Sequence, residues 1–212
     1  MKIDLYVITD EAIAGGRSHA DIARLAIAGG ADVIQLRDKM RESTDLIRIA
    51  REIREITRDA GVCFIVNDRL DIALACGADG VHLGQGDISP GIARQLAPPG
   101  FIIGVSVGNP CEACRAEREG ADYIALSPTF STGSKTDAGP GHGCSVLEEI
   151  YRRVSIPVIA IGGIGPDNIS EVILAGAQGV AVISAVVEKP DITAAARELA
   201  TIIASEKKKW QV

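Results

Sequence analysis

The segment that decides the fold is Gly30-Ala31-Asp32-Val33-Ile34-Gln35-Leu36, because its pattern occurs again three times along the 212-residue chain. Each copy places glycine and alanine ahead of a strand-like apolar run, and the further copies are 77–83, 120–126 and 176–183. Intervals of about 50 residues predict one supersecondary unit that is repeated.

Each unit contains a second short apolar run, and these runs are 4–8, 63–66, 101–105 and 157–161. All eight runs are nearly continuous rather than alternating, which is typical of parallel strands covered on both faces. Helical patterns lie between them, such as 44–56, where apolar residues at 46, 49, 50, 53 and 56 share one face. The chain therefore predicts an alternation of parallel strands and helices.

Two α/β architectures fit this alternation. A doubly wound dinucleotide-binding sheet needs Gly-x-Gly-x-x-Gly after the first strand, but residues 9–16 read Thr-Asp-Glu-Ala-Ile-Ala-Gly-Gly. Four repeated units fit a closed barrel better, so we predict a single-domain TIM (β/α)8 barrel over 1–212. The Gly-rich stretch 127–144 lengthens one unit and predicts a loop over the active face.

Composition excludes several classes of protein. A 47% hydrophobic chain with 24% charged residues can bury a core, which argues against disorder. The net charge of -6 and an aromatic content of 3% argue against nucleic acid as a partner. No apolar run is long enough to span a membrane and the N-terminus resembles a strand, so we expect a cytoplasmic protein without a membrane partner. The Cys111–Cys114 spacing lacks a second pair, and we interpret it as coincidence.

Catalytic groups of a TIM barrel lie at the carboxyl ends of the strands. In Gln35-Leu36-Arg37-Asp38-Lys39 a strand period of two puts residues 35, 37 and 39 on one face. Arginine and lysine suit phosphate oxygens, although a solvated charge cluster explains the segment equally well. Lys135, on another strand-end loop, favours the phosphate site.

Asp68 and Asp87 follow the third and fourth predicted strands. Their carboxylates can converge on Mg²⁺, which prefers oxygen ligands and substrate phosphates. The alternative is that each aspartate caps the following helix. Spacing alone leaves both interpretations open.

A second anion site is predicted after the seventh and eighth strands. Gly162-Gly163-Ile164-Gly165 precedes a helix that opens at 166–168, and Ile183-Ser184 ends the last strand. Backbone N–H groups at this position of a TIM barrel commonly bind phosphate.

The three histidines form no catalytic triad with a serine. His82 is expected in the core, His19 on the surface and His142 in the long loop without an assigned role. No Gly-x-Ser-x-Gly elbow is present, so the sequence does not favour a hydrolase.

Taken in order, these motifs resemble the thiamine-phosphate synthase family over essentially the whole chain. The segments that carry the resemblance are Gln35–Lys39, Asn67-Asp68, His82–Asp87, Gly104–Ser106, Thr132–Lys135, Gly162–Ile164 and Val182–Ala185. The resemblance implies a transferase of thiamine biosynthesis. It would join 4-amino-2-methyl-5-(diphosphooxymethyl)pyrimidine to 4-methyl-5-(2-phosphooxyethyl)thiazole, which gives thiamine phosphate and diphosphate.

The resemblance also implies roles for matching residues. The pyrimidine diphosphate would be bound by Gln35, Leu36, Arg37, Asp38, Lys39, Asn67, Ser106 and Lys135. The catalytic residues would be Arg37, Lys39, Ser106 and Lys135. The thiazole phosphate would be bound by Thr132, Gly133, Ser134, Gly163, Ile183 and Ser184, and the Mg²⁺ cofactor by Asp68 and Asp87.

The implied mechanism is dissociative: the C–O bond of the pyrimidine substrate breaks to a stabilised cation, and cationic groups stabilise the leaving diphosphate. The family loop usually has threonine where this chain has Ser134. Two alternatives remain: a thiazole tautomerase of the same barrel family, which is expected to carry histidine where Ser127-Pro128 stands, and a phosphate-sensing barrel without turnover. The sequence leaves the oligomeric state, including a homo-oligomer, open.

Overall fold

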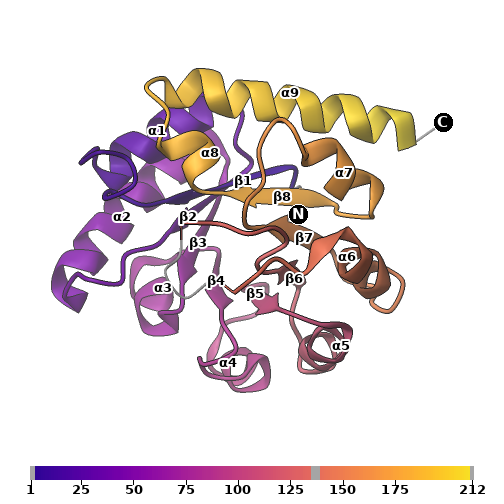
Figure 1. Cartoon of the computed structure of the whole chain (residues 1–212). Coiled ribbons are helices and arrows are strands. Elements are labelled where there is room, and N and C mark those ends of the chain that lie inside the picture. Colours follow the sequence, from indigo (N-terminus) through magenta and orange to yellow (C-terminus); the bar gives the residue numbers. More distant parts are fainter. Residues whose placement is uncertain (1–2, 135–138, 211–212) are drawn as a thin grey trace.

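The computed structural model describes residues 3–134 and 139–210, with only the backbone at residue 210. Eight parallel strands pair in chain order, and the last pairs with the first to close a barrel (Figure 1). The strands are β1 Leu5–Thr9, β2 Val33–Leu36, β3 Cys63–Asn67, β4 Gly80–Leu83, β5 Ile102–Val107, β6 Tyr123–Leu126, β7 Val158–Ile161 and β8 Gly179–Val182. The predicted TIM barrel is confirmed.

The helices surround the barrel and cover its outer face (Figure 1). They are α1 His19–Ala28, α2 Ser43–Ala60, α3 Leu70–Cys76, α4 Pro90–Leu96, α5 Pro110–Arg118, α6 Gly143–Tyr151, α7 Ile169–Leu174, α8 Ser184–Val187 and α9 Ile192–Trp210. The long α9 packs on α1, α7 and α8, so the end of the chain lies against both the first and the last units of the barrel. Among the described helices, none is long and apolar enough to cross a membrane.

The apolar stripe predicted on the second helix lies on α2 and faces the core. Leu46, Ile49, Ala50 and Ile53 are buried, as predicted. The next buried position is Thr57 rather than residue 56, because the helical repeat of 3.6 residues continues four positions beyond Ile53. The Thr57 hydroxyl donates to the Ile53 carbonyl at 3.0 Å, which satisfies this polar group inside the core.

The repeated Gly-Ala pattern ends a helix in every unit. Gly30, Gly77, Gly120 and Gly176 all have positive φ angles, between 68° and 103°. The alanine that follows each glycine donates its N–H to a carbonyl five residues earlier, as Ala78 does to Ala73 at 2.9 Å. This is the Schellman pattern, in which glycine adopts the left-handed conformation without steric cost.

The residue after each Gly-Ala pair joins two neighbouring strands at their amino ends. Its side chain accepts the N–H of the first or second residue of the preceding strand: Asp32 from Leu5, Asp79 from Phe64, Asp122 from Ile103 and Gln178 from Val158. Its own N–H donates to a carbonyl of that same strand. The repeat therefore fixes strand register at the amino ends of the strands, the face opposite the active-site end, where its role is in stability.

Candidate active site

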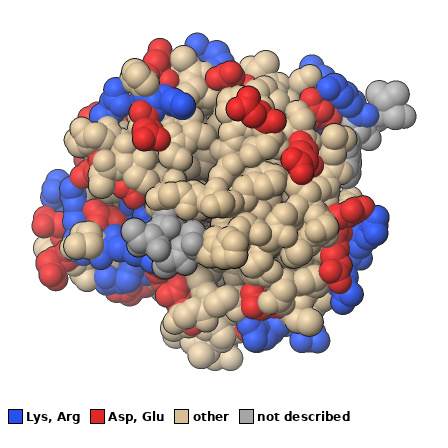
Figure 2. Space-filling view, in the orientation of Figure 1, with Lys and Arg blue, Asp and Glu red and all other residues tan. Residues whose placement is uncertain are grey.

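The described residues enclose a cavity of about 1030 Å³ at the carboxyl ends of the strands. Its lining comes from the ends of β2 to β8 and the loops that follow them, including the long loop after β6. In the orientation of Figure 1, charged side chains gather around the edge of the molecule and other residues form most of its centre (Figure 2). A cavity of this size and position is typical of a binding site for small molecules.

Arg37 and Lys39 lie just beyond the end of β2 and line the cavity. The Arg37 Nη1 donates to the Asp10 carboxylate at 2.8 Å, and the Arg37 side chain is only 12% exposed. Its Nε–H is buried and has no partner among the described residues. An unpaired buried donor is costly, and an anion that entered the cavity would satisfy it.

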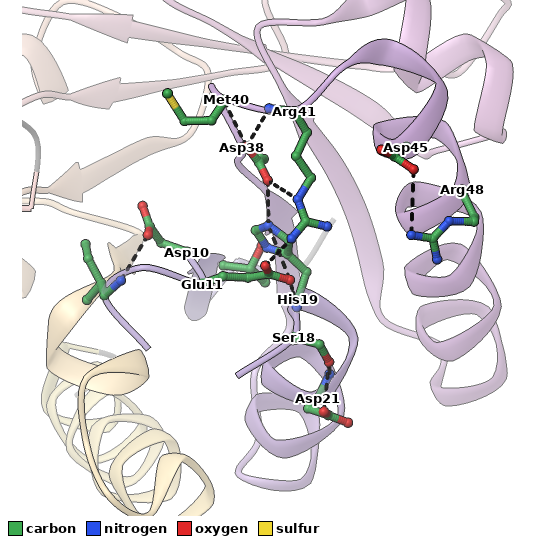
Figure 3. A network of polar contacts seen from close by, with 12 residues as sticks. Asp10, Glu11, Ser18, His19, Asp21, Asp38, Met40, Arg41, Asp45 and Arg48 are labelled. Atoms are coloured by element: carbon green, nitrogen blue, oxygen red, sulfur yellow. Dashed lines mark hydrogen bonds and ion pairs between the residues drawn. The ribbon is translucent and has the colours of Figure 1, made fainter. Parts of the chain in front are cut away.

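A network of charged groups surrounds Asp38, which stands between Arg37 and Lys39 in the sequence (Figure 3). Asp38 turns away from the cavity, where its carboxylate accepts the Met40 and Arg41 N–H groups at 2.9 and 3.1 Å and pairs with His19. Burial alone would raise the pKa of Asp38, but these backbone and histidine hydrogen bonds outweigh it and lower the pKa below its usual value. The network therefore holds the loop after β2 in place, and Asp38 itself does not line the cavity.

His19 belongs to this network, and the expectation that it lies on the surface is wrong. The side chain is 1% exposed, with Nδ1 2.7 Å from the Thr9 hydroxyl and Nε2 3.3 Å from Asp38. It begins α1, but it points inward beneath Arg41, which pairs with Asp38 and Glu11 (Figure 3). The sequence indicated that His19 begins a helix, but this position does not determine whether the side chain faces the core or the solvent.

Three of the predicted pyrimidine-site residues do not line the cavity. Gln35 and Leu36 are buried in β2, and Asp38 lies in the network described above. The Gln35 amide donates to the Tyr6 hydroxyl at 2.6 Å. Lys135 lies outside the described residues, while Asn67 and Ser106 line the cavity together with Arg37 and Lys39.

Asp68 and Asp87 both line the cavity, and the interpretation that they cap helices is wrong. Arg69 is at the start of α3, and Ser89 caps α4 with its hydroxyl. Asp68 has a φ of 61°, a conformation that is uncommon for residues with side chains and that gathers at functional sites. Asp87 accepts the Gly84 N–H at 2.7 Å through one carboxylate oxygen.

These two carboxylates fit a magnesium ion that is completed by substrate. Within residues 3–134 and 139–210, no group of three or more His, Cys, Asp and Glu side chains is arranged to hold a metal alone. Mg²⁺ is commonly bound through one or two carboxylates, water and substrate phosphate. The donor set of Asp68 and Asp87 beside Arg37 and Lys39 matches that mode.

The glycines after β7 allow the loop after β6 to pack against them. Gly162 and Gly163 have φ angles of 98° and 65°, and a Cβ on Gly163 would lie 2.5 Å from the Ser131 carbonyl oxygen. The Phe130 N–H donates to the Gly162 carbonyl at 3.0 Å. Gly163 therefore lies at the cavity wall, where the loop after β7 packs against the loop after β6.

The predicted thiazole-phosphate residues come together from three loops. Thr132, Gly133, Ser134, Gly163, Ile183 and Ser184 all line the cavity. The Ser134 hydroxyl lies 3.0 Å from the Ser184 hydroxyl, and the Ser134 N–H lies 3.2 Å from the Thr132 hydroxyl. Hydroxyl and N–H groups so gathered can bind phosphate oxygens.

Two histidines line the cavity although the sequence assigned neither of them to it. His82 is 6% exposed and bonded to Tyr123 and Ser106, which confirms that it is a satisfied core residue. His142 lies against Gly108, where an added Cβ would approach its ring within 3.2 Å. The glycines around residue 142 in the sequence gave no indication of the contact between His142 and Gly108. This contact depends on how the loop after β6 crosses the end of β5.

The closed barrel and the cavity at its carboxyl ends define a TIM-barrel protein with the active-site position of that class of enzyme. The family model described as thiamine monophosphate synthase matches residues 5–186. The chain belongs to this family.

Known proteins resemble the chain over its full length. The thiamine-phosphate synthases of Methanoregula boonei and Methanoculleus marisnigri are 64% and 63% identical to it, and the matches cover 100% and 98% of this chain and 98% of each relative. A solved structure of thiamine phosphate pyrophosphorylase from Pyrococcus furiosus superposes with a TM-score of 0.90 at 41% identity. That match covers 97% of both chains.

Proposed function

We propose that the chain condenses 4-amino-2-methyl-5-(diphosphooxymethyl)pyrimidine with 4-methyl-5-(2-phosphooxyethyl)thiazole, with Mg²⁺ as cofactor. Thiamine phosphate and diphosphate are the products. Family membership and the full-length relatives support thiamine-phosphate synthesis. The observation that supports the substrate assignment is one cavity lined both by the cations Arg37 and Lys39 and by the Ser134–Ser184 hydroxyl pair, two groups suited to bind two anions.

We place the diphosphate at the end of β2 because the cations Arg37 and Lys39 line the cavity there. Arg37 offers its unpaired Nε–H, and Asp10 holds the guanidinium so that this donor is in place before the ligand arrives. Lys39, Asn67 and Ser106 line the same cavity. We assign Lys135 to this group from the sequence alone.

The thiazole phosphate belongs at the ends of β6, β7 and β8. Thr132, Ser134 and Ser184 supply hydroxyl groups there, and Gly163 brings backbone to the cavity wall. A phosphate bound at this end would hold the thiazole in the same cavity as the pyrimidine, which lowers the entropic cost of bringing two substrates together.

Asp68 and Asp87 would hold the magnesium ion. When bound, Mg²⁺ would offset charge on the diphosphate and so favour its departure. Arg37, which Asp10 holds in place, and Lys39 would act on the same developing charge.

The proposed bond-breaking step is dissociative. The ring amino group of the pyrimidine donates electron density to the exocyclic carbon, the C–O bond breaks, and both electrons leave with diphosphate. The thiazole nitrogen then attacks the carbon with its lone pair. This nitrogen carries no proton, so the reaction requires no general base and no catalytic triad.

The test is an assay of thiamine phosphate with purified protein, both substrates and Mg²⁺. Product that depends on both substrates and disappears with EDTA supports the proposal. A thiazole tautomerase would instead convert a thiazole isomer without the pyrimidine, and a sensing barrel would bind phosphate without turnover. Either outcome would overturn the synthase assignment, and EDTA-insensitive product would overturn the role of magnesium.

A further inference from the structure

Five side chains from five strands form a continuous hydrogen-bonded chain through the barrel interior. Gln35 Nε2 lies 2.6 Å from the Tyr6 hydroxyl, which lies 3.0 Å from the Tyr123 hydroxyl. The Tyr123 hydroxyl lies 2.9 Å from His82 Nδ1, and His82 Nε2 lies 2.9 Å from the Ser106 hydroxyl. The chain ends at Ser106, which lines the cavity.

Gly104 makes room for this arrangement. In register it stands between His82 on β4 and Tyr123 on β6. A Cβ on Gly104 would lie 2.0 Å from Cζ of Tyr123 and 2.3 Å from its hydroxyl. Only glycine therefore allows the phenol to cross β5 and reach His82.

The polar groups of this chain before Ser106 are almost fully buried. Tyr6, Tyr123, Gln35 and His82 are at most 6% exposed. Burial raises the pKa of both tyrosines well above its usual value, so both phenols keep their protons at neutral pH. Each hydroxyl then has one hydrogen to donate, and a buried hydrogen without an acceptor is costly.

The orientation of Gln35 sets the direction of every bond in the chain. Gln35 donates to Tyr6. The distances from Tyr6 to Tyr123 and from Tyr123 to His82 Nδ1 suit a hydrogen bond in either direction. The one arrangement that gives each buried hydroxyl hydrogen an acceptor within this chain sends the Tyr6 hydrogen to Tyr123 and the Tyr123 hydrogen to Nδ1 of His82. Nδ1 must accept, which leaves the proton of a neutral imidazole on Nε2. Nε2–H then donates to Ser106, whose own hydrogen is left for another acceptor.

We propose that Tyr6, Tyr123 and His82 are positioning residues that fix the Ser106 hydroxyl as a hydrogen-bond donor toward the substrate diphosphate. This inference rests on the proposed function for the identity of the anion. A donor prepared in advance suits an oxygen that gains negative charge as the C–O bond breaks. If every hydrogen bond ran in the opposite direction, the Ser106 hydroxyl would donate to His82 and would present only lone pairs to that oxygen.

The direction of the chain is tested without any substrate. The ¹⁵N NMR spectrum of the free protein, assigned with His82→Gln, reports which ring nitrogen carries a proton. We expect a proton on Nε2 and none on Nδ1. A proton on Nδ1, or on both nitrogens, would overturn the proposed direction. This result stands whether or not the protein makes thiamine phosphate, so the two proposals can fail separately.

The action on the anion is tested with inorganic diphosphate and Mg²⁺ by calorimetry. Tyr123→Phe breaks the chain two links from Ser106, and we expect roughly fivefold weaker diphosphate binding. Tyr151→Phe, on the outer face of α6, is the matched control and should bind as the parent does. Unchanged binding by a folded Tyr123→Phe would contradict the proposal. If that variant does not fold, Tyr6→Phe is measured with the same expectation.

A double-mutant cycle separates positioning from a general packing effect. If Tyr123 acts through Ser106, Tyr123→Phe should weaken diphosphate binding by much less when Ser106 is already alanine. Equal losses in the Ser106 and Ser106→Ala backgrounds would show that Tyr123 acts by another route and would overturn the relay.

Discussion

The hydroxyl groups of Ser134 and Ser184 lie 3.0 Å apart, although 50 residues separate them in the chain. Ser134 belongs to the long loop after β6, and Ser184 begins α8 directly after β8. The contact therefore joins two loops that wall the cavity at the proposed thiazole-phosphate site.

The first prediction is that these two hydroxyl groups act together. Ser134→Ala and Ser184→Ala should each raise the KM for the thiazole phosphate roughly three- to tenfold, the effect of one hydrogen bond. The double variant should lose less than the product of the single losses, because each single variant already breaks the shared contact. Steady-state kinetics measures all three variants, and fully multiplicative losses would refute the coupling.

The second prediction compares Lys135 with its neighbour. Lys135→Ala should lower kcat on the order of a hundredfold, since a cation that stabilises the leaving diphosphate is removed. Ser134→Ala should lower kcat much less, because we place the serine at the phosphate of the other substrate. Single-turnover rates with both substrates saturating compare them directly. Equal effects on kcat would argue against the role of Lys135.

The third prediction concerns magnesium. Asp68→Asn and Asp87→Asn should raise the Mg²⁺ concentration needed for half-maximal activity roughly tenfold or more, because each removes a charged oxygen ligand. Glu112→Gln is the matched control: Glu112 also lines the cavity, but its carboxylate accepts the Gly108 N–H and the Asn109 amide at 2.7 and 2.8 Å. A similar shift in all three variants would point to the general charge of the cavity instead.

The fourth prediction concerns the repeated strand contacts. Asp122→Ala leaves the buried Ile103 N–H without its acceptor and should lower the free energy of unfolding by about 1 to 3 kcal/mol. Asp122→Asn should cost less, because the amide oxygen of Gln178 makes the same contact in the fourth repeat. Urea unfolding monitored by circular dichroism measures both variants. Equal losses would mean that the charge, including the pair with Arg94, matters more than the acceptor.

The fifth prediction concerns acid stability. The pKa of Asp38 is lowered in the fold, so its ionised form stabilises the protein above the unfolded-state pKa of about 3.9. This contribution is lost as the pH falls through the lower folded-state pKa. Asp38→Asn should therefore be less stable at neutral pH and show a flatter decline in acid. Asp45→Asn, at an exposed site on α2, is the control for urea unfolding across pH. If the free energy of unfolding of Asp38→Asn fell with decreasing pH as steeply as that of the parent chain, Asp38 would be excluded as a source of the acid sensitivity.

The sequence by itself determined the barrel, because the features that build it are local. A glycine with positive φ ends each repeated helix, and the next residues start an apolar strand. Strand-end positions also indicated most of the cavity lining, since parallel strands bring all their carboxyl ends to one face.

Only the tertiary structure decided which way single side chains face and which distant groups meet. His19 turned inward to Asp38, and Gln35 bonded to Tyr6 instead of lining the cavity. The chain from Tyr6 through Tyr123 to His82 depends on three strands that are far apart in sequence. No local pattern encodes such contacts, because closure of the barrel sets the distances across its interior.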